Sequence, residues 1–187
     1  LISKGLTMYS ANLNVCPAGL HGLLERQWQK LSATLQRSVL CVDQVNALTR
    51  VVASSNYVLE QLVNKPKLLM ELIDSGDLGC VYGEEDYANK LAALIADVED
   101  EALLEQQLRL FRAREMTRLI WRDCNRLSDT QQTIKELSAL ADACIDESLD
   151  LKANESTIIS SGISIHIGDP NFAGIIIPRS GLGAKKG

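Results

Sequence analysis

The sequence predicts an all-α protein, in which a multi-helix array of about six helices is followed by an irregular or weakly β C-terminal tail. Apolar residues make up 46% of the 187 residues, which is enough for a sizeable core, and aromatic residues make up only 4%. Apolar side chains recur at helical spacing until residue 152, whereas the rest is rich in Ile, Ser and Gly. We therefore expect a lead-in over residues 1–18, a helical domain over 19–152 and a tail over 153–187.

Two amphipathic segments open the helical domain. Residues 22–35, GLLERQWQKLSATL, and residues 42–53, VDQVNALTRVVA, are both predicted helices. Their expected buried faces consist of Leu23, Leu24, Trp28, Leu31 and Leu35 in the first segment, and of Val42, Val45, Leu48, Val51 and Val52 in the second.

Turn and cap residues divide the next stretch. Ser54 or Ser55 can cap a short helix over residues 56–63. Pro66 suits the first turn of a helix over residues 66–75, and Gly76 is a typical residue for its end. Residues 77–83, DLGCVYG, are expected to be a linker.

Three longer patterns complete the array. A helix starting near Glu84 has a predicted apolar face, and a long helix runs from about Asp100 to Leu127. Ser128 and Gln131 fit a capping box that opens a helix ending near Leu151. The expected buried faces are Tyr87, Leu91, Leu94, Ile95 and Val98 in the first of these helices, and Ile134, Leu137, Ala141, Cys144 and Ile145 in the last.

The long helix contains the arginine-rich stretch LRLFRAREMTRLIWRD, residues 108–123. Its apolar residues fall on several sides, which predicts a central helix enclosed by its neighbours. Arg114, Arg118 and Arg122 form a row that needs carboxylates from elsewhere, and Glu115 lies in the middle of an apolar stripe. We expect Glu115 to be buried and bonded to Arg112, Arg118 or an arginine of another helix. Two interpretations of the row remain open: internal ion pairs that tie the helices together, which we favour, or a site for an anionic ligand.

Charge and cysteine content restrict the class of protein. The net charge of −5 argues against a general nucleic-acid-binding protein. The five cysteines are widely spaced and include no CxxC, which favours reduced, mostly buried thiols in a cytoplasmic protein. No apolar run is long enough to cross a membrane. His21 and His166 have no visible catalytic partners, and we expect neither a catalytic nor a metal-ligating residue in the chain.

Three stretches together resemble the glutamine synthetase adenylyltransferase family, whose members both add and remove adenylyl groups. They are residues 51–78, VVASSNYVLEQLVNKPKLLMELIDSGDL, the arginine-rich stretch, and residues 127–151, LSDTQQTIKELSALADACIDESLDL. The resemblance covers about residues 20–151 and points to the start of the N-terminal, adenylyl-removing half. It implies a nucleotidyltransferase that acts on a tyrosine of glutamine synthetase, uses Mg²⁺ with ATP or ADP, and is regulated by the PII signalling protein.

The tail departs from the family pattern. The family continues into a glycine loop of the form G-(M/L)-G-K-x-G and then an S-D-x-D carboxylate pair. Here GLGAKKG places Gly181 and Gly183 at loop positions, where their amides could contact a phosphate, but Ala184 stands where lysine is expected. No carboxylate pair follows, so we expect the chain alone to be inactive, with a tail that starts a truncated or frameshifted nucleotidyltransferase domain. The alternative is a non-catalytic helical module for protein interaction.

Overall fold

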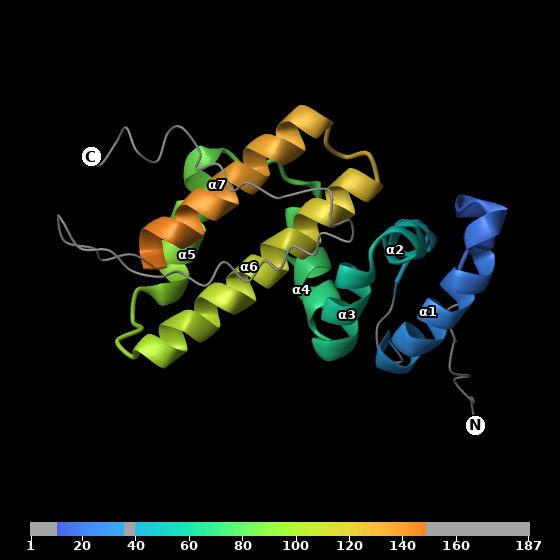
Figure 1. Cartoon of the computed structure of the whole chain (residues 1–187), viewed down its shortest axis with the longest axis horizontal. Coiled ribbons are helices and arrows are strands. Elements are labelled where there is room, and N and C mark those ends of the chain that lie inside the picture. Colours follow the sequence, from blue (N-terminus) through green and yellow to red (C-terminus); the bar gives the residue numbers. More distant parts are fainter. Residues whose placement is uncertain (1–10, 36–39, 149–187) are drawn as a thin grey trace, which may run out of the picture. The chain divides into compact units, whose positions relative to one another are not determined.

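Seven α-helices and three short 3-10 helices make up the described part of the chain (Figure 1). The computed structural model describes residues 11–35 and 40–148, which all belong to one compact unit, residues 1–150. No strand occurs in these two ranges, so the all-α prediction is confirmed. In chain order the elements are η1 Leu13–Val15, η2 Ala18–Leu20, α1 His21–Leu35, α2 Val42–Ser54, α3 Asn56–Asn64, α4 Leu68–Asp74, η3 Asp77–Gly79, α5 Glu84–Ile95, α6 Glu101–Cys124 and α7 Thr130–Ser148.

Cap residues explain several helix boundaries. The Ser55 hydroxyl accepts a hydrogen bond from the Val58 amide at the start of α3, and the Asp100 carboxylate accepts one from the Leu103 amide at the start of α6. Gly76 follows α4 with a φ of 73°, a left-handed conformation that glycine adopts without strain. These three boundary predictions are confirmed.

Two other boundary predictions are wrong. Helix α4 begins at Leu68, so Pro66 lies in the preceding turn instead of the first helical turn. The cap of α7 is Asp129, whose carboxylate accepts a hydrogen bond from the Gln132 amide at 2.7 Å. Ser128 instead contacts the Thr133 hydroxyl at 2.8 Å.

The described helices enclose two apolar cores, and α6 contributes to both. The first core combines α1–α4 with Trp121 of α6. The second combines residues of α5 and α7 with Phe111 and Leu119 of α6. Figure 1 shows α6 passing between α5 and α7 on one side and α2–α4 on the other. The prediction that the arginine-rich segment is the central helix is therefore confirmed.

Some predicted faces differ from the observed ones. Val42 leaves 74% of its surface exposed at the start of α2, although Leu48, Val51 and Val52 are buried as expected. In α7 the predicted face is wrong in part: Ile134, Leu137 and Ala141 are exposed, whereas Cys144 packs against the second core. The buried residues of α7 are Glu136, Ala139, Leu140 and Ala143.

The shift in α7 has a polar cause. Glu136 turns toward α6 because Arg118 of that helix requires a carboxylate partner, and the two small alanines allow close approach. A rule that places only apolar residues inward cannot anticipate this orientation. Among the described residues, no helix combines the length and hydropathy that a membrane span needs. The tail, including His166, Gly181 and Gly183, lies outside the described residues.

Leu48 and Val42 both belong to the predicted buried face of α2, and their different exposure allows a matched test. Leu48 is fully buried in the first core, so we expect Leu48→Ala to lower the free energy of unfolding by about 2–5 kcal/mol. Val42→Ala in the same helix should change it by less than about 0.5 kcal/mol, because the side chain is exposed. Urea titration followed by circular dichroism measures both. Equal effects of the two substitutions would contradict this assignment of the core.

Candidate functional site

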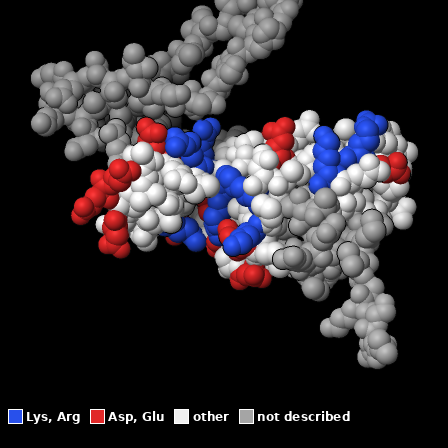
Figure 2. Space-filling model, turned by 90° about the horizontal axis from the view of Figure 1, so that it is seen from below, with Lys and Arg blue, Asp and Glu red and all other residues white. Residues whose placement is uncertain are grey.

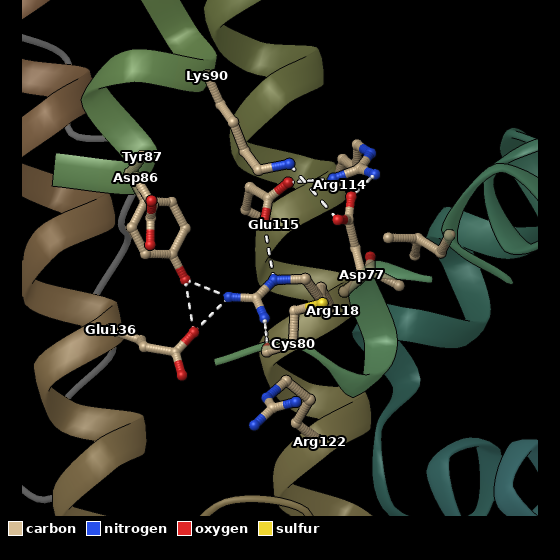
Figure 3. Close-up of polar contacts among 12 residues, drawn as sticks. Asp77, Cys80, Asp86, Tyr87, Lys90, Arg114, Glu115, Arg118, Arg122 and Glu136 are labelled. Carbon is tan, nitrogen blue, oxygen red and sulfur yellow. Dashed lines mark hydrogen bonds and ion pairs between the residues drawn. The ribbon is translucent and has the colours of Figure 1, made fainter. Parts of the chain in front are cut away.

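A buried network of charged side chains lies between α6 and its neighbours (Figure 3). Its centre is Arg118, which is fully buried, as is Glu115 one turn earlier on the same helix. Glu136 of α7 and Tyr87 of α5 are 1% and 0% exposed. Charges removed from water in this way are stable only when they are paired and hydrogen-bonded. Because it gathers most of the buried charged side chains of the described residues, we regard this network as the candidate functional site.

Every nitrogen of the Arg118 guanidinium has a partner. Nε donates to Glu115 at 2.9 Å, and Nη1 donates to the backbone carbonyl of Cys80 at 2.8 Å. Nη2 donates to the Tyr87 hydroxyl at 2.6 Å and forms an ion pair with Glu136. The Tyr87 hydroxyl in turn donates to Glu136 at 3.0 Å. One side chain of α6 thus connects α5, α7 and the segment after η3.

Aromatic rings cover the same guanidinium. Its central carbon lies 3.7 Å from the centroid of the Tyr82 ring and 5.7 Å from that of Tyr87. Cations over aromatic faces are stabilised by the ring quadrupole, most strongly where water is excluded. Burial raises the pKa of the Tyr87 hydroxyl, and Glu136 beside it raises that pKa further despite the opposing charge of Arg118. Tyr87 therefore stays protonated and can serve as a hydrogen-bond donor.

Arg114 forms the outer part of the network. It pairs with Glu115 of its own helix and with Asp77 of η3, at 2.5 Å from the latter. Lys90 of α5 approaches the same Asp77 at 3.4 Å. Burial by itself raises the pKa of the Asp77 carboxyl, but polar contacts with Tyr82, Arg114 and Ser75 outweigh this and hold the pKa well below its usual range. Asp77 is consequently ionised under physiological conditions.

Arg122 differs from the other two arginines of the row. It is 1% exposed and donates to the backbone carbonyls of Leu78 and Leu127, both at 3.0 Å. The carbonyl of Leu127 belongs to the turn that follows α6, and a cation is favoured at this end of a helix by the helix dipole. The expectation that every arginine of the row needs a carboxylate is therefore wrong for Arg122 among the described residues.

The network favours the interpretation of internal ion pairs over that of an anion site. Arg114, Arg118 and Lys90 carry three positive charges, which the carboxylates of Asp77, Glu115 and Glu136 balance. The prediction for Glu115 is confirmed: it is buried and bonded to Arg118. Arg114 is a second partner of Glu115 that the sequence analysis did not name.

Sequence reasoning missed most partners of the arginines. Asp77 lies in the segment expected to be a linker, and Glu136 lies between two residues of the predicted apolar face of α7. A carboxylate set between two apolar positions of a helix, next to a helix with an arginine row, is the signal that could have identified Glu136. Tyr82 and Tyr87 carry no such signal, because aromatic residues are common in cores without any polar role.

The remaining candidate residues lie apart from the network. His21 is the first residue of α1, and its Nε2 atom lies 3.2 Å from the Cys16 carbonyl oxygen. All five cysteines are free, but the prediction of mostly buried thiols is wrong, since Cys41 and Cys80 are exposed and the others are partly buried. In the described ranges no cluster of His, Cys, Asp and Glu has the composition of a metal site.

An open groove of about 670 Å³ lies beside the network. It is bounded by the start of α4, by α5 and by the middle of α6, and Lys90, Arg114 and Glu115 are among its lining residues. Apolar side chains form most of the remaining surface. Lys90, Arg114 and Glu115 therefore belong both to the charged network and to the lining of the groove.

Comparison with known proteins agrees with the sequence pattern. A family model described as glutamate-ammonia ligase adenylyltransferase matches residues 45–177, well over half of the chain. The chain belongs to this adenylyltransferase family. The bifunctional glutamine synthetase adenylyltransferase/adenylyl-removing enzyme of Pseudomonas aeruginosa is 39% identical over 104 residues, which are 56% of this chain and 11% of that enzyme. The enzyme of the same name from Thioalkalivibrio sulfidiphilus is 34% identical over 137 residues, or 73% and 14% of the two chains.

The match covers only a small part of the length of these adenylyltransferases. The chain spans between a tenth and a seventh of the length of the relatives named above. A relative of another kind, the deoxyuridine 5'-triphosphate nucleotidohydrolase of a Psychrobacter strain, is 60% identical over 45 residues, which are 24% of this chain and 29% of that enzyme. No solved structure matches the chain.

Removal of Glu115 should destabilise the fold. We expect Glu115→Ala to lower the free energy of unfolding by about 3–5 kcal/mol, because it leaves Arg118 buried with one carboxylate fewer. Glu105→Ala is the matched control on the same helix, since Glu105 forms an exposed pair with Arg109 that is worth about 0.3–0.5 kcal/mol. Chemical denaturation of both variants measures the difference. An unfolding midpoint of Glu115→Ala equal to that of Glu105→Ala would show that the buried pair is energetically unimportant.

Proposed function

We propose that residues 19–152 form the helical region at the start of the adenylyl-removing half of a bifunctional glutamine synthetase adenylyltransferase. The match of the family model to residues 45–177 carries this proposal. In this role the full-length enzyme would act on a tyrosine of glutamine synthetase in the cytoplasm, use Mg²⁺ with ATP or ADP, and respond to the PII protein. The three stretches that resemble the N-terminal half support the choice between the two halves.

The described helices would contribute structure and binding surface, and the chemistry would come from another part of the enzyme. Transfer of an adenylyl group needs metal ions that neutralise phosphate charge, and these ions need carboxylates free to bind them. Asp77, Glu115 and Glu136 are each held by an arginine within the fold. A divalent cation at any of them would meet those arginine charges. The alternative function is a helical interaction module that acts without a catalytic part.

The match to the nucleotidohydrolase suggests a second origin for part of the chain. We infer that its 45 residues lie mainly beyond α7, because the adenylyltransferase pattern of the sequence ends near Leu151 and the tail has a different composition. The family model extends to residue 177 and so overlaps this stretch. The identity of 60% over 45 residues supports a nucleotidohydrolase origin for that stretch.

This origin bears on the glycines of the tail. Gly181 and Gly183 remain proposed phosphate contacts through their backbone amides. The Psychrobacter enzyme is named for a nucleoside triphosphate substrate, which is compatible with such a role. The matched stretch is 29% of that enzyme, so it corresponds to a part of a nucleotidohydrolase.

A graft tests the function of the helical region. Residues 45–148 replace the matching residues of the Pseudomonas aeruginosa enzyme, and ADP release from adenylylated glutamine synthetase is followed with phosphate and Mg²⁺. We expect the graft to retain adenylyl removal, because the segment supplies the same helical framework. The same graft carrying Glu115→Ala should lose thermal stability, and with it activity at higher temperature.

Two outcomes would contradict the proposal. A folded graft that adds adenylyl groups normally but does not remove them faster than a graft of an unrelated helical bundle would show that these residues do not serve the adenylyl-removing half. The purified 187-residue chain, assayed in the same way, should release no ADP above a control without protein. Turnover by that chain would place the catalytic groups within it.

Mass spectrometry of the natural protein can check whether the two stretches are joined in one polypeptide. Digestion with trypsin should yield a peptide that crosses Lys152 through a missed cleavage and joins the end of α7 to residues 153–179. Its detection would show that both stretches are made as one polypeptide. If peptides of the two sides occur only in proteins of different mass, the joining of the two stretches is wrong.

A further inference from the structure

The groove beside the charged network has an apolar floor and an exposed apolar edge. Leu68 of α4 and Phe111 of α6 are buried at its base. Leu94 of α5 and Leu110 of α6 line it as well, yet 44% and 40% of their surfaces are exposed to solvent. Exposed leucines that converge on one concave surface are typical of a site that buries a partner's apolar side chains.

Basic side chains border this apolar surface. Lys65 and Lys67 lie just before α4, whereas Lys90 belongs to α5 and Arg114 to α6. One exposed carboxylate, that of Glu71, is also part of the lining. Figure 2 views the described residues from below and shows Lys and Arg side chains near the middle of that face, interspersed with Asp and Glu side chains and beside uncharged surface. The groove lining has four basic side chains against two carboxylates, Glu71 and Glu115, whereas the whole chain has a net charge of −5.

The four basic residues are not equally available. Lys90 and Arg114 face Asp77, so most of their charge is balanced within the network. Lys65 and Lys67 take part in none of the ion pairs among the described residues. Lys65 and Lys67 outnumber Glu71 at the start of α4, so this part of the lining carries a positive charge that an incoming carboxylate can pair with.

We propose that this groove docks an acidic amphipathic helix of a partner protein. Its apolar face would cover Leu94 and Leu110, and its carboxylates would meet Lys65 and Lys67. An open groove suits a chain segment better than a small molecule, because small ligands are normally enclosed over most of their surface. The docking proposal is independent of the proposed role in adenylyl transfer. Either proposal can therefore be contradicted while the other holds.

Binding can be measured directly on the full chain. The probe is a fluorescein-labelled peptide with the repeated sequence Leu-Leu-Glu-Glu, followed by fluorescence anisotropy at low ionic strength. We expect saturable binding that weakens as salt is added, because the contribution of exposed charges is screened. A peptide in which lysine replaces every glutamate is the control and should not bind.

Two matched pairs of variants locate the binding surface. Leu110→Ser should weaken binding by about tenfold or more, whereas Leu103→Ser should not, although both leucines lie on α6 with nearly equal exposure. Lys67→Glu should weaken binding by about tenfold, and Lys135→Glu on α7 should leave it unchanged. Circular dichroism establishes that each variant is folded.

Several results would overturn the proposal. Among them are the absence of saturable binding to the folded chain and equal effects of groove and control variants. If sedimentation shows that the chain self-associates and that Leu110→Ser abolishes this association, the occupant of the groove is a second copy of this chain instead of a partner helix. Displacement of the peptide by ADP at a stoichiometry of one would identify the groove as a nucleotide site.

Discussion

The burial of Arg118 is the constraint on which the second half of the described fold depends. A guanidinium without access to water must find acceptors for its N–H groups and a counter-charge, or the folded state is destabilised by several kcal/mol. Arg118 finds these partners on α6 itself, on α5, on α7 and on the segment after η3. Each of these elements must be in place for the others to be stable, so this network couples their positions.

Such a network specifies an arrangement more than it adds stability. Replacing buried ion pairs by apolar side chains of similar size is often neutral or stabilising in other proteins, because charged groups lose their hydration on burial. What the pairs contribute here is orientation: Glu136 determines which side of α7 faces α6, and Asp77 holds η3 against Arg114. The two apolar cores, joined through α6, supply the hydrophobic free energy.

The proposed function gives this architecture a supporting role in a longer enzyme. The chain matches between a tenth and a seventh of the adenylyltransferases named above, and the charges of its network are largely balanced within the fold. A rigid helical unit of this kind can present surfaces to other parts of the enzyme or to a partner. The groove between α4, α5 and α6 is such a surface, and ion pairs with Asp77 hold two of its lining residues, Arg114 and Lys90.

The helical class, the approximate helix positions and the central place of α6 are determined by the sequence itself, because amphipathic spacing and cap residues such as Ser55 and Gly76 act locally. The burial of Glu115 also follows from the local pattern, because Glu115 lies within an apolar stripe of α6 and Arg118 lies one turn further along the helix. Which face of α7 turns inward, and which groups accept hydrogen bonds from Arg118 and Arg122, were decided only by the tertiary structure. Cys80 and Glu136 are 38 and 18 residues from Arg118 in sequence, and Asp77 is 37 residues from its partner Arg114. Their pairing depends on how helices pack, and hydrophobic periodicity carries no information about a polar contact made across a helix interface.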